Sequence, residues 1–401
     1  MKKSILVGVV AILAIFSLVF VGQASTNEYI VDVTTFESTA GGCDAAGCSF
    51  EDAWSAANND GTDSVINFDL DYPAIITTTA GDGTAAFYNI TDDGALLIQG
   101  PGSENLTFAT VSGDAWAFLM AVEDSEVNPA NVAFSGLTFD GYTFDFVIAN
   151  KNNTFEDIVF GDNLFFVDDE GGSLINNCEF SKSSTWTTDD VTVSNSTFDN
   201  VNLQVNGSNW VVEGNDFLNC EGETIGLYLT PLASNTLVSE NTFTDNVNAM
   251  LMGDGGTDNV ISNNTFTNNG NHVWYNDDTT ISDNTFTITH LWLKGDGWLV
   301  EGNEFSGNTE YAPISFQEDS SNNTVTENNF FDNEYRVITL GNPSTNNTIS
   351  DNTFINNQGD SVINVVAASD NNVFFGNTFE ESGYDTSYAA YEMGYTYDKT
   401  N

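Results

Sequence analysis

The stretch Asn259-Val-Ile-Ser-Asn-Asn-Thr-Phe-Thr-Asn-Asn269 decides the fold, and a close copy follows at Asn347-Thr-Ile-Ser-Asp-Asn-Thr-Phe-Ile-Asn-Asn357. Each copy places an apolar residue, an Asn three positions later and a Phe two positions after that Asn. The pattern recurs along the chain with a mean spacing of about 22 residues, which indicates an array of structural repeats. The recurring aromatic residues are Phe139, Phe160, Phe180, Phe198, Phe217, Phe243, Phe266, Phe286, Phe305, Phe330, Phe354 and Phe379.

The residues around each Phe predict strands that stack into coils. An apolar residue lies five positions before every one of these Phe residues, and the last eight repeats also place an Asn two positions before it. Short alternations such as Leu291 and Leu293 separate the repeats, and a period of two favours strands over helices. One repeat cannot bury its own apolar side chains, but stacked coils can set like residue on like. We therefore predict an all-β parallel β-helix (a β-solenoid) with internal ladders of Phe and of apolar residues.

The Asn residues are expected to mark a bend in each coil. The odd offset of three between the apolar residue and the Asn implies that the chain turns between them. An Asn tolerates the backbone conformation of a bend, and its amide can bond the next Asn above and below. Two other repeat folds fit less well, because the leucine-rich signature is missing and a propeller blade needs about 40 residues.

The repeat resembles the parallel β-helix repeats of NosD-like and pectin-lyase-like proteins over residues 130–380. This resemblance implies a single-stranded, right-handed parallel β-helix. Upstream, Cys48-Ser-Phe-Glu-Asp-Ala-Trp-Ser-Ala-Ala-Asn58 resembles the CSLREA segment that begins many exported surface β-helix proteins, with Glu51 in place of the usual Arg. Residues 50–58 are expected to form a short amphipathic helix that caps the open end of the first coil.

The chain start predicts export. Met1-Lys2-Lys3 precedes an apolar run over 5–21 and small residues up to Ala24, which is typical of a cleaved secretory signal. A retained membrane anchor is the alternative, although the run is short for crossing a bilayer. We therefore expect a signal peptide at 1–24, a cap segment at 25–60, the β-helix at 61–380 and a Tyr-rich tail or cap at 381–401. The location is secreted or cell surface, with no membrane insertion after signal cleavage.

The charge balance narrows the classes of partner. The chain has 58 Asp and Glu against 7 Lys and Arg, a formal net charge of −51. Such a charge repels nucleic acids, anionic lipids and polyuronates, unless a divalent cation bridges the last of these. High salt, acid pH or bound Ca²⁺ would relieve the self-repulsion, and a merely well-solvated surface is the other interpretation. No cofactor is expected, with Ca²⁺ the one candidate.

The four cysteines are expected to serve structure. Cys43 and Cys48 bracket a short loop that an exported protein can close as a disulfide. Cys178 and Cys220 replace Asn within the repeats and are interpreted as small buried residues. Cys and His are too scattered to predict a structural zinc site.

One outward face is the candidate ligand platform. If Tyr275 and Leu293 point inward, alternation turns the residues before them outward and stacks them, with Lys294 and Arg336 nearby on the same sheet. Exposed aromatic side chains can pack against sugar rings. The alternatives are ordinary surface stacking under a loop, a partner interface, or a catalytic or metal role for the two histidines. The predicted substrate-binding residues are Tyr228, His272, Trp274, His290 and Trp292.

The sequence favours a structural, adhesive or glycan-binding role without catalysis, with a glycan or cell-surface polymer as the partner. A polysaccharide lyase or glycoside hydrolase on the outward sheet is the first alternative. A lyase needs a positioned Arg or Lys base, which few residues here can supply, and a hydrolase needs two facing carboxylates. The second alternative is a periplasmic metal-handling accessory protein, weakened by the presence of only two His.

Overall fold

The computed structural model describes residues 27–35, 42–44, 47–78, 86–90, 95–110, 118–122, 132–140, 146–149, 152–161, 164–167, 171–270, 272–358, 362–366, 369–380 and 382. The predicted signal peptide at 1–24 and nearly all of the predicted tail at 381–401 lie outside these residues. No helix within the described residues is both long and apolar enough to cross a bilayer.

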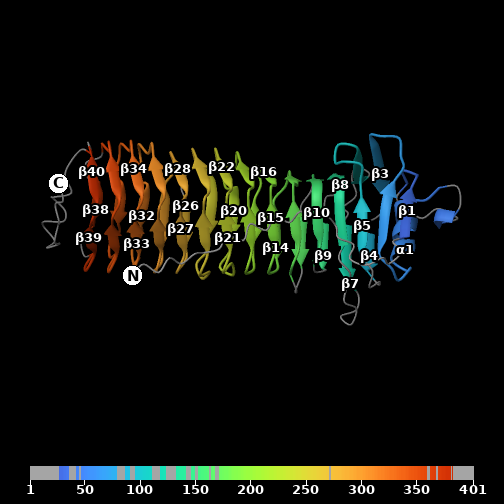
Figure 1. Cartoon of the computed structure of the whole chain (residues 1–401), viewed down its shortest axis with the longest axis horizontal. Coiled ribbons are helices and arrows are strands. Elements are labelled where there is room, and N and C mark those ends of the chain that lie inside the picture. Colours follow the sequence, from blue (N-terminus) through green and yellow to red (C-terminus); the bar gives the residue numbers. More distant parts are fainter. Residues whose placement is uncertain are drawn as a thin grey trace, which may run out of the picture.

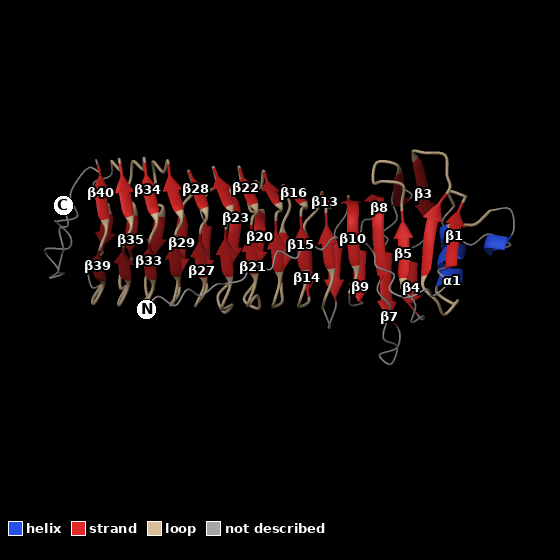
Figure 2. Ribbon diagram, in the orientation of Figure 1, coloured by secondary structure: helices blue, strands red, loops and turns tan. Residues whose placement is uncertain are grey.

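The described chain winds into an elongated parallel β-helix whose coils stack along one axis (Figure 1). Strands dominate every coil, with loops at the corners (Figure 2). Two sheets run the length of the molecule, a 27-stranded sheet that we call sheet A and a 13-stranded sheet that we call sheet B. The predicted all-β fold class is confirmed.

Sheet B receives one strand per coil, except that the first and the last coil contribute none within the described residues, and its neighbouring strands pair in parallel. Its strands are β4 (Ala86–Ile90), β7 (Phe118–Val122), β9 (Phe146–Ala149), β11 (Leu164–Val167), β14 (Ser184–Thr187), β17 (Leu203–Val205), β20 (Ile225–Leu229), β23 (Asn248–Met252), β26 (His272–Tyr275), β29 (Leu291–Lys294), β32 (Ile314–Phe316), β35 (Ile338–Leu340) and β38 (Ile363–Val365).

Sheet A begins with longer strands and continues with pairs of short ones. The upstream strands are β1 (Asn27–Val31), β2 (Ser64–Phe68), β3 (Ala74–Thr78), β5 (Leu96–Gln99), β6 (Leu106–Thr110), β8 (Val132–Asp140) and β10 (Thr154–Phe160). The strands that carry the apolar ladder are β12 (Leu174–Asn176), β15 (Thr192–Ser194), β18 (Val211–Glu213), β21 (Leu237–Ser239), β24 (Val260–Ser262), β27 (Thr280–Ser282), β30 (Leu299–Glu301), β33 (Thr324–Thr326), β36 (Thr348–Ser350) and β39 (Val373–Phe375). Those that carry the Phe ladder are β13 (Glu179–Phe180), β16 (Thr197–Asp199), β19 (Asp216–Leu218), β22 (Thr242–Thr244), β25 (Thr265–Thr267), β28 (Thr285–Thr287), β31 (Glu304–Ser306), β34 (Asn329–Phe331), β37 (Thr353–Ile355) and β40 (Thr378–Glu380).

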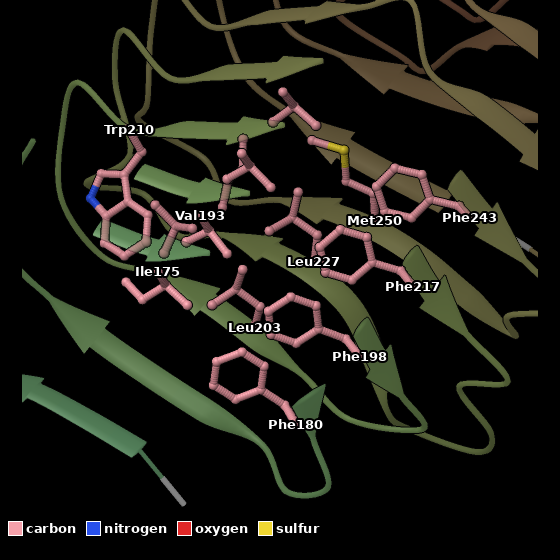
Figure 3. Close-up of a cluster of buried hydrophobic side chains, with 14 of the residues drawn as sticks. Ile175, Phe180, Val193, Phe198, Leu203, Trp210, Phe217, Leu227, Phe243 and Met250 are labelled. Carbon is pink, nitrogen blue, oxygen red and sulfur yellow. The ribbon is translucent and has the colours of Figure 1, made fainter. Parts of the chain in front are cut away.

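The predicted Phe ladder is confirmed as the spine of the core. From Phe180 to Phe379, successive ring centroids are 4.5–5.0 Å apart and the rings are nearly parallel. Figure 3 shows the stack beside the apolar ladder, here Ile175 and Val193. Phe108 extends the ladder upstream at 5.6 Å from Phe139, a coil that the repeat pattern did not reach. Offset-stacked rings and the burial of apolar area together hold the coils in register.

The predicted Asn ladder is also confirmed. Each buried amide donates from Nδ2 to Oδ1 of the next Asn at 2.9–3.1 Å. The members are Asn215, Asn241, Asn264, Asn284, Asn303, Asn328, Asn352 and Asn377. The left-handed bend conformation belongs to the preceding residue rather than to the ladder Asn, for example Asn263 at φ 57° and Asp283 at φ 56°. That position faces solvent, which leaves the inward Asn free to bond along the axis.

Two further amide ladders occupy the other corners of the coil, and the sequence analysis missed both. One runs through Asn246 and Asn269 and resumes at Asn308, Asn333 and Asn357. The other includes Asn323, Asn347 and Asn372. Their signal was present as an Asn three residues after the Phe and an Asn two before the apolar ladder residue.

The N-terminal end of the core is closed by the helix α1 (Phe50–Ala57), as predicted, next to the 3-10 turn η1 (Gly42–Asp44). Phe50 and Trp54 are buried against the first coils, and the centroid of the Phe50 ring lies 5.0 Å from that of Phe108. Because β1 pairs with β2, the sheet starts at Asn27, inside the segment expected as a cap.

All four cysteines lie within the described residues. Cys43 and Cys48, the pair expected to close a short loop, are bonded as a disulfide. Cys178 and Cys220 are free and buried. Cys178 occupies the first Asn ladder and Cys220 the second, since their backbone N–H groups donate to Ser196 and to Asn246 of the next coil. The interpretation of these two as small buried residues is confirmed.

Candidate functional site

The outward face of sheet B carries a row of side chains that the strand register aligns along the axis. The row runs Trp292, Ser315, Thr339 and Asn364, one residue per coil, and the backbone register continues upstream through Val273. Tyr228 stands in the same row further upstream, where it pairs with Leu251. The structure therefore places Tyr228 and Trp292 on one face but separates them by two intervening coils.

The predicted outward position of Trp274 is wrong. Trp274 is fully buried, its indole N–H donates to the Met250 carbonyl at 3.0 Å, and Tyr275 is the exposed residue. The register pairs Trp274 with Leu293 and Tyr275 with Lys294, one residue away from the assumed alignment. A slip of one residue exchanges the two faces of a strand, so Trp274 belongs to the core rather than to a ligand platform.

The two histidines do not form the predicted outward pair. His290 is buried, 5% exposed, with its ring centroid 4.7 Å from that of Tyr311 and 5.6 Å from that of Trp292. Burial lowers the pKa of His290 to about 4, so its imidazole is neutral at pH 7. The backbone of His272 pairs with Leu291, and its side chain lies outside the described residues. His290 thus supports the aromatic residues above it instead of facing solvent.

A groove of about 320 Å³ opens on sheet B over β29, β32 and β35. Trp292, Ser315 and Thr339 form its floor, because they are consecutive members of the outward row. One wall is formed by residues that precede the strands in the sequence, and the other by residues that follow them. The first wall consists of Tyr311, Ala312, Tyr335 and Arg336, and the second of Gln317, Glu318 and Gly341.

The walls of this groove, which we call the sheet B groove, offer both stacking and hydrogen-bonding groups. Tyr311 is 44% exposed and packs edge-on against Trp292, with ring centroids 6.3 Å apart. Tyr335 is 39% exposed, and the Arg336 guanidinium lies 5.7 Å from its ring centroid. Lys294 lies 5.9 Å from the Tyr275 ring centroid on the same sheet. The sequence analysis missed both tyrosines because they lie in loops outside the alternating runs.

The groove lining restricts the chemistry that the site can perform. Glu318 is the one carboxylate among the lining residues, whereas hydrolysis of a glycosidic bond uses two carboxylates across the bond. Within the described residues, His, Cys, Asp and Glu form no group of three that could hold a metal ion. The arrangement is suited to binding through aromatic faces and neutral polar groups.

Comparisons with known proteins agree with the fold. Residues 146–286 match the family model described as right-handed beta helix region, and residues 269–401 match the model of the periplasmic copper-binding protein NosD. No curated protein matches the chain in sequence. Together with the stacked parallel strands, these matches identify a right-handed parallel β-helix repeat protein.

Solved structures extend the likeness over most of the chain. The A-module of mannuronan C-5 epimerase AlgE6 from Azotobacter vinelandii is 14% identical with a TM-score of 0.53, covering 82% of this chain and 93% of that one. The catalytic unit of a GH87 alpha-1,3-glucanase from Streptomyces thermodiastaticus is 16% identical with a TM-score of 0.51, covering 91% and 71%. At such identities, the likeness shows the shared fold alone.

Proposed function

We propose that the protein is an exported glycan-binding β-helix, located outside the cell or in the periplasm, which uses the sheet B groove without catalysing a reaction. The observation that carries this proposal is the combination of Trp292, Tyr311 and Tyr335 around a polar floor. Sugar rings present C–H faces that pack on aromatic rings and hydroxyl groups that need polar partners. The groove supplies both within one concave surface.

Two further observations support the proposal. Packing restricts the side chains of Trp292 and Tyr311, since both rings contact the buried His290 ring. A preformed site loses less conformational entropy when it binds a ligand. The names of the solved relatives refer to a mannuronan epimerase and an alpha-1,3-glucanase, so this fold accommodates polysaccharides in those proteins.

The test is retention on immobilised polysaccharides, namely cellulose, chitin, mannan, β-1,3-glucan, α-1,3-glucan, alginate and polygalacturonate. We expect the parent protein to be retained on at least one polymer. Trp292→Ala and Tyr335→Ala should each weaken retention about tenfold, as expected for an aromatic anchor. Tyr228→Ala is the matched control, because Tyr228 lies on the same outward row but outside the groove.

Two results would contradict the proposal. The first is absence of retention on every polymer, and the second is an equal loss in the Tyr228 control and the groove variants. Incubating each polymer with the protein, with and without Ca²⁺, checks the non-catalytic part, because reproducible release of oligosaccharides would show turnover. Copper retention through dialysis checks the metal-handling alternative that the NosD match raises.

A further inference from the structure

Resting on the proposed function, we infer that the ligand is a neutral, extended polysaccharide whose chain runs along the β-helix axis across β29, β32 and β35. The direction follows from the construction of the groove. Its floor residues Trp292, Ser315 and Thr339 belong to three successive coils. Its walls stand at the two ends of the strands, so the open direction crosses the strands. The direction across the strands is the long axis of the molecule (Figure 1).

The spacing of the coils fits one sugar residue per coil. Neighbouring strands of a sheet are about 4.7–4.9 Å apart, and the same spacing separates successive floor residues here. This distance is close to the length of one sugar residue in an extended glycan. Tyr311 and Tyr335 occupy equivalent positions, each three residues before the first residue of its sheet B strand, so the wall repeats with the same period.

The side chains of the outward row change in size along the axis. Upstream, the row carries the large side chains of Tyr228 and Leu251, and Trp292 lines the groove. Downstream, it carries the smaller side chains of Ser315, Thr339 and Asn364. A terminal sugar can therefore stack on Trp292, and the rest of the chain can extend toward the C-terminal coils.

The charges favour a neutral chain. Arg336 and Glu318 line opposite walls, so the formal charges of the groove cancel. The whole chain carries a formal charge of −51, which repels a polyanion before it reaches the groove. The hydroxyls of Ser315 and Thr339 and the amide of Gln317 instead suit the hydroxyl groups of a neutral sugar.

The experiment measures Kd by calorimetry for oligosaccharides of one to six residues, prepared from the neutral polymer that retains the protein best, beside uronate oligomers of equal length. We expect Kd to fall roughly fivefold to tenfold per added residue up to about three residues and then to level off. Uronate oligomers should bind at least about tenfold more weakly.

Thr339→Trp tests where the oligosaccharide lies, because the larger side chain would fill the downstream part of the groove floor. It should weaken trisaccharide binding at least about tenfold while changing monosaccharide binding by no more than about twofold. Thr324→Trp is the matched control, because Thr324 is a half-buried outward residue of a three-residue strand in sheet A. A Kd that is independent of length, an equal loss for the monosaccharide, or uronates that bind as tightly would overturn this inference while leaving glycan binding intact. If no glycan binds at all, the proposed function itself fails.

Discussion

The upstream coils and the regular coils from residue 171 turn the same corner in different ways. Upstream, β8 and β10 each continue as one strand on both sides of the bend, where Gly136 (φ 62°) and Asp157 (φ 56°) take the left-handed conformation. The inward position directly after the bend holds Leu137 and Ile158, which pair with each other. Downstream, each long strand is replaced by two strands of two or three residues, and the same position holds Cys178, Ser196 and then the Asn ladder. The same fold therefore uses an apolar corner at one end and an amide corner at the other.

The backbone explains this difference. Where pairing lapses only at the bend residue and resumes at the next, the inward residue pairs within the sheet, so a hydrocarbon side chain suffices there. Where the strand breaks, buried backbone groups need other partners. Asn303 supplies them, because Nδ2 donates to the Ile281 carbonyl at 2.8 Å and Oδ1 accepts from the Asn284 N–H at 2.9 Å. The amide therefore bonds backbone groups that the interrupted strand leaves without sheet partners. The bend itself does not require an amide.

The largest expected effect comes from placing an apolar residue, as found in the upstream corner, at the Asn position of a downstream corner. Asn303→Leu removes the amide and leaves at least two buried backbone groups without partners, so we expect a loss of about 4 kcal/mol in the free energy of unfolding. Urea denaturation measures it. Asn329→Leu is the control, since Asn329 is exposed on the outer face and should change stability by less than about 0.5 kcal/mol. Equal losses in both variants would break the comparison.

The reverse exchange should cost somewhat less. Leu137→Asn buries an amide in a corner whose backbone groups are already bonded, and it also removes apolar packing. We expect a loss of about 3 kcal/mol. Leu137→Ile, which keeps the volume, should cost less than about 1.5 kcal/mol. If Leu137→Asn is as stable as the parent, the corner accepts an amide whether the strand is continuous or interrupted, which would contradict this explanation.

A smaller effect concerns the N-terminus of the helix α1, which closes the upstream end of the core and begins after the N-cap residue Ser49. The Ser49 hydroxyl accepts from the Asp52 N–H at 3.1 Å, and the Asp52 carboxylate accepts in return from the Ser49 N–H. Ser49→Ala should therefore lower the free energy of unfolding by about 1 kcal/mol. The residue Ser55 on the exposed side of α1 offers the control, and Ser55→Ala should leave stability nearly unchanged. Thermal unfolding followed by circular dichroism compares the two, and equal shifts would contradict a capping role.

The smallest effect is a pH dependence at the same end, because Asp60 is only half-buried and solvent screens its interactions. Burial raises the pKa of Asp60, but hydrogen bonds from Ser64, Asn27 and Tyr29 outweigh it and lower the pKa to about 2. Because the unfolded chain titrates near pH 4, this contribution is present above about pH 4 and is lost as the pH falls toward 2.

The measurement is the difference in unfolding free energy between the parent and Asp60→Asn, taken at pH 5 and at pH 2.5. The difference should shrink at the lower pH. Subtraction removes the shared response of the other carboxylates. A difference that is constant with pH would show that Asp60 keeps an ordinary pKa.

The sequence predicted the Phe ladder, the apolar ladder and the first Asn ladder because each depends on a fixed offset within one repeat. The apolar residue and the Phe keep their distance in every regular coil, and the Asn joins them from Asn215 onward, so their faces follow from counting. The connection from this unit to sheet B varies in length. Trp274 lies eight residues after Phe266, whereas its register partner Leu293 lies seven after Phe286. An uneven connection changes the phase of the next strand, and the run His272 to Tyr275 has too little alternation to reveal it.

The groove escaped prediction for a related reason. Tyr311 and Tyr335 lie in loops where no periodicity reports which way a side chain points. Tyr311 contacts both Trp292 and the buried His290. These contacts depend on which coils become neighbours and on the register between them.

By itself, the sequence determined the β-helix, its Phe spine, one amide ladder and the capping helix, because these follow from local spacing and from the need of each coil to bury its apolar side. Only the tertiary structure decided that Trp274 faces inward, that His290 lies beneath Tyr311, and that an axial groove opens on sheet B. The physical reason is that side-chain direction in sheet B is set by pairing with neighbouring coils, and a single residue more or less in a corner reverses it.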